Sequence, residues 1–219
     1  MMKFIYRLTM ARSKKMIVQT YGKDFYIQFR NRSDSLFKSV LKETPDIGES
    51  IFSFNYAYAP SYVAWYKTMM ELGLNQKQAD ELMWHMNEKM LLTVPKPLLH
   101  MVGKAYLNSF RKKAKQHMLR QENGSLHPFD WEIEYRDINK NEFMIKIKKC
   151  GFITYADKFD ARGILPGICA VDYIVAYYMK NGFHRTKTLG YGDDCCDCRY
   201  ALNGSCPLKP GNGQNSVMQ

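Results

Sequence analysis

The chain has 219 residues, of which 46% are hydrophobic and 24% are charged, and its formal net charge is +11. This composition is ordinary for a globular protein and excludes a disordered or collagen-like chain. The length suits one domain or two small ones, with enough residues to bury a core. The basic excess lies entirely in residues 1–120, because acidic and basic residues balance in 121–219.

Neither a membrane span nor a secretory signal is predicted. The most apolar stretch, residues 164–179, is interrupted by Asp172, and no segment reaches the roughly 20 apolar residues that a membrane helix needs. The N-terminal segment is basic but lacks a continuous apolar run. We therefore expect a cytoplasmic protein with reduced cysteines that serve metal binding, catalysis or packing.

The first half of the chain is predicted to be helical. Helical periodicity covers residues 3–44 and returns over 60–72, where a proline occupies the first turn and a glycine follows the last. Asn75 and Gln78 form a capping-box pattern ahead of a helix with one Met-rich apolar face. A further helix with a basic C-terminal end is expected over 97–121.

The second half mixes strands and helices. Residues 131–137 and 142–149 alternate with period two on either side of a plausible hairpin turn. A short helix, a long helix and two more strands follow, over 152–160, 164–180, 183–191 and 195–202. We therefore predict an α+β fold, in which N-terminal helices pack with a small antiparallel sheet that a buried helix crosses.

The predicted domain organisation is a single α+β domain over residues 1–202. Residues 1–122 form its mainly helical, basic part, and residues 123–202 hold the sheet and the candidate site. Residues 203–219, rich in Gly, Pro and Asn, are expected to be a flexible tail.

Asp172 is the most informative residue for function. In a helix over 165–179 it falls among the core-facing apolar side chains, one turn after Cys169. A carboxylate there is costly unless it is paired or hydrogen-bonded. The pattern predicts either a buried acid beside a thiol, suited to proton transfer or to binding a cationic group, or a structural aspartate paired with Arg185 or Arg199.

The cysteine cluster and the two arginines leave alternatives open. Four cysteines have the spacing C-C-x-C-x7-C, which lacks the paired C-x2-C of a zinc ribbon, so packing as small buried side chains is favoured over a metal site that folding would assemble. Arg185 and Arg199 can each bind a substrate carboxylate through two parallel hydrogen bonds, or pair with Asp172 or Asp197. The basic first half could contact nucleic acid, but no recognised nucleic-acid motif accompanies it.

The C-terminal third resembles the L-2-amino-thiazoline-4-carboxylic acid hydrolase family. The resemblance rests on a cysteine after a strand, a C-x-x-D helix and a final run of matching positions: Cys150, then Cys169 and Asp172, then Arg185, Thr186, Thr188, Leu189, Gly192, Cys196, Asp197 and Arg199. One departure is Cys198, which stands where the family usually has phenylalanine.

The resemblance implies a hydrolase that needs no cofactor or metal. It would open a small cyclic amidine or thiazoline, such as 2-aminothiazoline-4-carboxylate, to an N-carbamoyl amino acid. The residues that it implies as catalytic are Asp172, Cys196, Cys150 and Cys169. Those that it implies for substrate binding are Arg185, Arg199, Thr188 and Asp197. The attack can come from an activated water or from a cysteine thiolate, and these routes stay open.

Two other functions remain as alternatives to the hydrolase. One is a sensor module that binds a small ligand or a metal through the cysteines without turnover, and the other, less favoured, is nucleic-acid binding. The expected partner is a small-molecule substrate, with no membrane and an open oligomeric state. The hydrolase hypothesis requires that Asp172 and at least two of Cys150, Cys169 and Cys196 line one small cavity.

Overall fold

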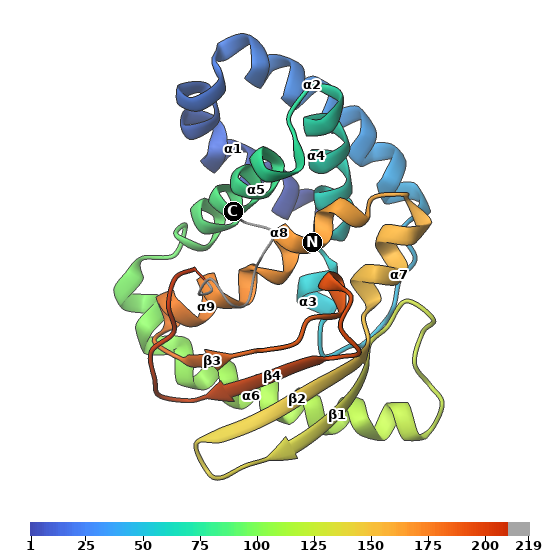
Figure 1. Cartoon of the computed structure of the whole chain (residues 1–219), viewed down its shortest axis with the longest axis vertical. Helices are drawn as coiled ribbons and strands as arrows, with labels where there is room; N and C mark the ends of the chain where they lie inside the picture. The colour runs from blue at the N-terminus through green and yellow to red at the C-terminus, as the bar shows by residue number, and fades with distance from the viewer. Residues whose placement is uncertain (210–219) are drawn as a thin grey trace.

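Helices make up the first half of the chain, as predicted. The structure is a computed structural model that describes residues 1–209 (Figure 1). Its helices in this half are α1 (Met2–Tyr21), α2 (Lys23–Glu43), α3 (Ser53–Tyr56), α4 (Ala59–Glu71), α5 (Gln76–Leu91) and α6 (Lys96–Glu122). The predicted capping box is present: Gln78 donates its backbone N–H to the Asn75 side chain, and Asn75 donates its own to the Gln78 side chain.

Four antiparallel strands form the sheet, in the order β1-β2-β4-β3. The second half of the chain contains β1 (Glu132–Asp137), β2 (Glu142–Lys149), α7 (Gly151–Lys158), η1 (Arg162–Ile164), α8 (Leu165–Cys169), α9 (Val171–Met179), β3 (Gly182–His184), η2 (Leu189–Tyr191) and β4 (Cys196–Ala201). The predicted α+β class, with N-terminal helices and a small antiparallel sheet, is confirmed.

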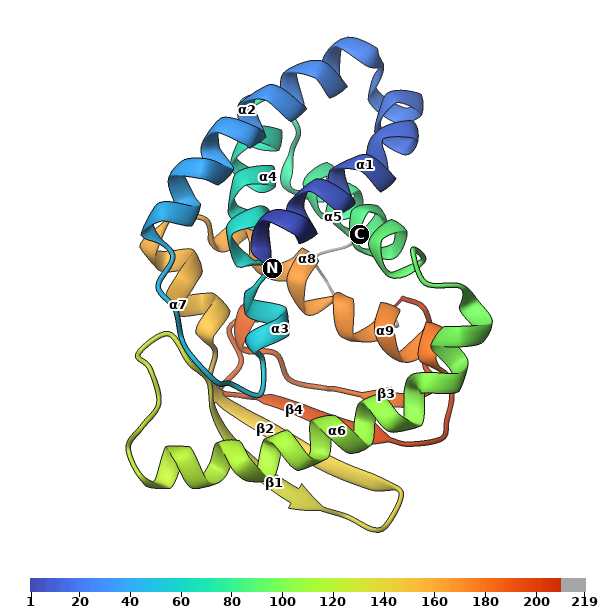
Figure 2. The same cartoon turned by 180° about the vertical axis from the view of Figure 1, so that it is seen from behind.

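The helices and the sheet occupy separate parts of the molecule. Helix α6 runs along the sheet, while α1, α2, α4 and α5 gather at the opposite end, and α8 and α9 lie between the two groups (Figure 2). A continuous set of buried apolar residues extends from α1 to β4. Among residues 1–209, none of the helices combines the length and the apolar character that crossing a membrane requires.

The helix predicted over 164–180 is interrupted at Ala170. There the backbone tightens, because Tyr173 donates its N–H to the Ala170 carbonyl, three residues back. The Cys169 carbonyl instead accepts a hydrogen bond from Arg185, at 2.7 Å. The interruption therefore frees a carbonyl for a side chain that comes from 16 residues later in the sequence.

The strand predicted over 183–191 ends at His184. Beyond it, Thr186 and Lys187 donate their backbone N–H groups to the Asp197 carboxylate, at 2.8 and 2.7 Å, so these groups cannot join a strand ladder. Most of the tail predicted over 203–219 lies outside the described residues. Within the described part, Cys206 is buried and packs in the core.

Candidate active site

An ion pair between Asp172 and Arg185 organises the candidate site. Asp172 lies in the first turn of α9, and Arg185 follows β3. Arg185 donates from Nη1 to Asp172 Oδ2 at 2.9 Å and from Nη2 to the Cys169 carbonyl. Its guanidinium also lies over the rings of Tyr173 and Phe183. Of the two arginines considered from the sequence, Arg185 is thus the one that pairs with Asp172.

Pairing does not close off the Asp172 carboxylate. Its side chain keeps 33% of its surface exposed, whereas that of Arg185 keeps only 5%. Asp172 lines a small void of about 30 Å³ together with Asn181, Tyr106 and other residues. Burial raises the pKa of Asp172, and the nearby Arg185 opposes this shift. The carboxylate is therefore anchored on one side and open on the other.

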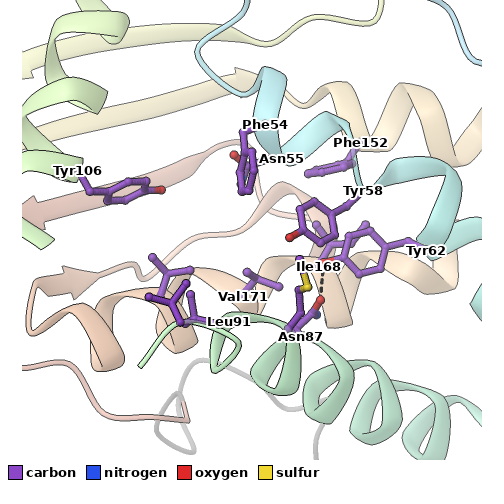
Figure 3. Close-up of a pocket in the computed structure, with 13 residues that line it drawn as sticks. Phe54, Asn55, Tyr58, Tyr62, Asn87, Leu91, Tyr106, Phe152, Ile168 and Val171 are labelled. Carbon is purple, nitrogen blue, oxygen red and sulfur yellow. Dashed lines mark hydrogen bonds between the residues drawn. The ribbon is translucent and has the colours of Figure 1, made fainter. Parts of the chain in front are cut away.

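A larger cavity, of about 200 Å³, adjoins this void. The two share four lining residues, namely Asn55, Tyr106, Val171 and Val175. Figure 3 shows side chains from α3, α5, α6 and α9 that converge on the larger cavity. Because Val171 precedes Asp172 in α9, the larger cavity lies next to the carboxylate.

Among the described residues, three tyrosines and two asparagines supply the polar groups of the larger cavity. Tyr62 donates its hydroxyl to Asn87 Oδ1 at 2.8 Å (Figure 3). The Nδ2 group of Asn87 is buried and has no hydrogen-bond partner among residues 1–209. Burial raises the pKa of Tyr58 to about 12, and burial with the charge of Asp172 does the same for Tyr106. Both tyrosines therefore keep their protons at neutral pH and can donate hydrogen bonds.

The three candidate cysteines converge on the ion pair from separate elements. Cys150 precedes α7, Cys169 ends α8 and Cys196 begins β4. Cys169 interacts electrostatically with Arg185, with the other two thiols and with Asp172. However, none of these three cysteines is among the described residues that line the two cavities, so the expectation that they share one cavity with Asp172 is wrong for both cavities.

Burial keeps these thiols protonated. It raises the pKa of Cys196 to about 12 and also raises those of Cys150 and Cys169. The positive charge of Arg185 lowers the pKa of Cys169 and Cys196, but burial outweighs it. Cys196 also accepts the backbone N–H of Leu189 at its sulfur, at 3.2 Å. At neutral pH the cluster thus contains thiols rather than thiolates.

Arg199, Asp197 and Thr188 do not line either cavity. Side chains alternate along β4, so that Cys196 and Cys198 are buried while Arg199 is exposed and pairs with Glu142. Asp197 accepts hydrogen bonds from the loop after β3. Thr188 is buried and donates its backbone N–H to Asp193. In this geometry Asp197 and Thr188 shape the loop and Arg199 lies on an inner strand of the sheet, so none of the three contributes to the cavities.

The sequence reasoning did not identify Asn87 or Asp80 as candidate residues, although both are buried in α5. They are seven residues apart, so they share one face of the helix. The sequence does contain a signal for them, because two polar residues with helical spacing lie beside the Met-rich face of this helix. The sequence prediction used only the apolar face. Asp80 accepts a hydrogen bond from Gln76, but its Oδ2 has no partner among residues 1–209.

A second hollow lies between α1 and α2, outside the candidate site. Its volume is about 770 Å³. Asp34 is the acidic residue among its described lining residues, and the basic ones are Lys3, Arg7, Lys14, Arg30 and Lys38. Part of the basic excess of the first half gathers there. In the described part of the chain, no group of three or more His, Cys, Asp or Glu residues is arranged to hold a metal ion.

Comparison with known proteins gives one match. The model of the family described as L-2-amino-thiazoline-4-carboxylic acid hydrolase matches residues 54–200. This range begins in α3 and ends in β4, so it includes the ion pair and the three cysteines and leaves out α1 and α2. No curated protein matches the chain.

Proposed function

The chain belongs to the L-2-amino-thiazoline-4-carboxylic acid hydrolase family, and on this premise we propose that it hydrolyses a small cyclic amidine. The observation that carries the proposal is Asp172, which Arg185 anchors through Oδ2 and which lines the small void. A carboxylate in this setting can bind an amidinium as it binds a guanidinium. The first substrate to test is 2-aminothiazoline-4-carboxylate, whose C2 atom is an amidine-like centre.

Water is the attacking group in this proposal. The void beside Asp172 is large enough to hold a water molecule. Because burial raises the pKa of Asp172, its carboxylate is a stronger base than an exposed one. The water oxygen adds to C2 and passes a proton to Asp172. The C2–S bond then breaks, the sulfur leaves as a thiol with the proton from Asp172, and the added hydroxyl releases its proton to solvent water as C2=O forms.

The raised pKa values of the three cysteines favour water over a thiolate. Covalent attack would need a thiolate, and burial disfavours that form at Cys150, Cys169 and Cys196. In the proposed reaction these thiols stay neutral. They therefore do not compete with Asp172 for the positive charge of Arg185. The cysteine variants described below test whether the covalent route operates instead.

The test is turnover of 2-aminothiazoline-4-carboxylate and related cyclic amidines, followed by product mass. Asp172→Asn removes both the base and the negative charge, so kcat/KM falls at least about a hundredfold. The matched control, Glu142→Gln, neutralises a carboxylate that pairs with Arg199 on the sheet and lines neither cavity, and it keeps full activity. Equal activity of Asp172→Asn and Glu142→Gln contradicts the proposal.

The cysteine variants separate the two routes of attack. Under the water route, Cys150→Ser, Cys169→Ser and Cys196→Ser each keep kcat/KM within about tenfold, because none supplies the attacking atom. A loss beyond a hundredfold in one of them, with a substrate-mass adduct on the unmodified protein, replaces the water route with the covalent one.

The other two functions have their own signatures. A sensor module on this fold would bind 2-aminothiazoline-4-carboxylate or a related cyclic amidine without changing the mass of the compound. Nucleic-acid binding through the hollow between α1 and α2 would give sequence-preferring DNA shifts. Retention on heparin would not distinguish it, because a net charge of +11 suffices for that.

A further inference from the structure

The lining of the two cavities contains one charged residue among those that the structure describes, and it is Asp172. No Lys, Arg or His lines either of them. Arg185, the nearest cation to Asp172, already donates to that carboxylate and to the Cys169 carbonyl, and it is 5% exposed. A ligand carboxylate would therefore lie near a like charge, with no cation among the described lining residues to pair with it, which is unfavourable.

The size of the larger cavity points to an apolar group on the ligand. An apolar cavity of about 150 Å³ accommodates a benzene ring, and this one measures about 200 Å³. Its wall is mostly aliphatic and aromatic, including Phe54, Phe152, Ile168 and Val175. A five-membered heterocycle held at Asp172 would leave this space without a group of matching polarity.

An unpartnered amide marks the side of the cavity formed by α5. Asn87 is 6% exposed, its Oδ1 is held by the Tyr62 hydroxyl, and its buried Nδ2 donates to no described residue. A buried donor left without an acceptor is destabilising. A ligand atom that accepts a hydrogen bond at this position would remove that cost.

We propose that the site selects a cyclic amidine that carries a ring-sized apolar substituent and no carboxylate. The amidinium lies against Asp172, the substituent fills the larger cavity, and a hydrogen-bond acceptor on it meets Asn87 Nδ2. The expected turnover of such a compound rests on the proposed hydrolase function. Its expected binding depends only on the residues that line the two cavities.

The experiment has a turnover arm and a binding arm. Turnover compares 2-amino-4-benzylthiazoline with 2-aminothiazoline-4-carboxylate, and the benzyl compound should have the higher kcat/KM by at least tenfold. Binding is measured by calorimetry with benzamidine and with 4-carboxybenzamidine, which differ by one carboxylate. Benzamidine should bind at least tenfold more tightly.

A charge-gain variant tests the cause of this preference. Leu91 and Leu92 are adjacent, half-buried leucines at the end of α5, and only Leu91 lines the cavity. Leu91→Arg should shift the binding ratio towards 4-carboxybenzamidine by at least tenfold, because it supplies the missing cation. Leu92→Arg, the matched control, should leave the ratio unchanged. If Leu91→Arg does not fold, as judged by circular dichroism, the preference of the unmodified protein decides alone.

The outcomes separate this inference from the proposed function. A preference for the carboxylate-bearing compounds, or no binding of benzamidine, overturns the inference, even if 2-aminothiazoline-4-carboxylate is hydrolysed. Tighter binding of benzamidine than of 4-carboxybenzamidine upholds the inference about recognition. If no amidine is then turned over, it is the hydrolase proposal that fails.

Discussion

Arg185 is the residue on which the geometry around Asp172 depends. It is buried, and it joins α9, the end of α8 and the segment after β3 through hydrogen bonds to Asp172 and Cys169. Removing one partner of a buried ion pair leaves the other charge uncompensated. Arg185→Met should therefore lower the free energy of unfolding, measured in urea at pH 7, by roughly 3–5 kcal/mol.

Arg199 offers the matched control for that measurement. Its pair with Glu142 is half exposed, and such pairs contribute about 0–1 kcal/mol. Arg199→Met should therefore have a small effect on unfolding. Equal losses in the two variants would mean that burial does not distinguish the two arginines, and the anchoring role given to Arg185 would be wrong.

Asp80 makes stability depend on pH. Burial raises its pKa to about 7, against an ordinary value of about 3.9. Between these values the folded chain binds the proton more tightly than the unfolded chain, so the free energy of unfolding falls as pH rises through this window. Asp80→Asn cannot ionise, so it should lose less stability than the unmodified protein between pH 5 and pH 8. Parallel stability curves would contradict this assignment.

At the scale of elements, local patterns predicted most of the structure. Period-two alternation located β1 and β2 to within one residue, and the Asn75–Gln78 capping box located the start of α5. Such signals are local, because side chains that repeat along one face must all find the same core. They failed at Ala170 and after His184, where groups distant in sequence take the backbone hydrogen bonds.

The loop after β3 supplies a prediction at this scale. Asp197 accepts the backbone N–H groups of Thr186 and Lys187. Asp197→Ala should speed hydrogen exchange of these two amides at least about tenfold, because it removes their acceptor, while the amides of β2 stay protected. Asp194→Ala is the control, since that exposed carboxylate accepts from the Lys187 side chain and the Cys195 thiol rather than from the two amides. Unchanged exchange in Asp197→Ala would refute the role of this carboxylate.

At the scale of the whole molecule, the site could be predicted only in part. Asp172, Arg185 and the cysteines were predicted from the sequence because they lie close together in the C-terminal third. The cavity is lined by residues from α3 to α9, and the meeting of these helices depends on tertiary packing. Nothing local to Asn87 or Tyr106 indicates that both line the larger cavity. The same limit explains why Arg199 was expected near the substrate, although strand alternation turns it away.

Helices α1 and α2 lie outside the range that matches the family, yet they cover its core. Tyr6 of α1 stacks on Phe37 of α2 with ring centroids 4.2 Å apart, and on Trp65 of α4 at 5.8 Å. Trp65 has no exposed surface in this arrangement. Removing residues 1–44 would expose this aromatic cluster to water, and large exposed apolar patches destabilise the packed state.

Deleting residues 1–44 should therefore abolish cooperative thermal unfolding and near-ultraviolet circular dichroism while leaving much of the helical signal, as in a molten globule. The graded counterpart is Tyr6→Ala in the full chain, which should cost about 3 kcal/mol because it truncates a buried aromatic residue. Both results would support the predicted single domain over 1–202. If the truncated chain instead unfolds cooperatively at the Tm of the full chain, α1 and α2 form a separate unit, and that domain prediction is wrong.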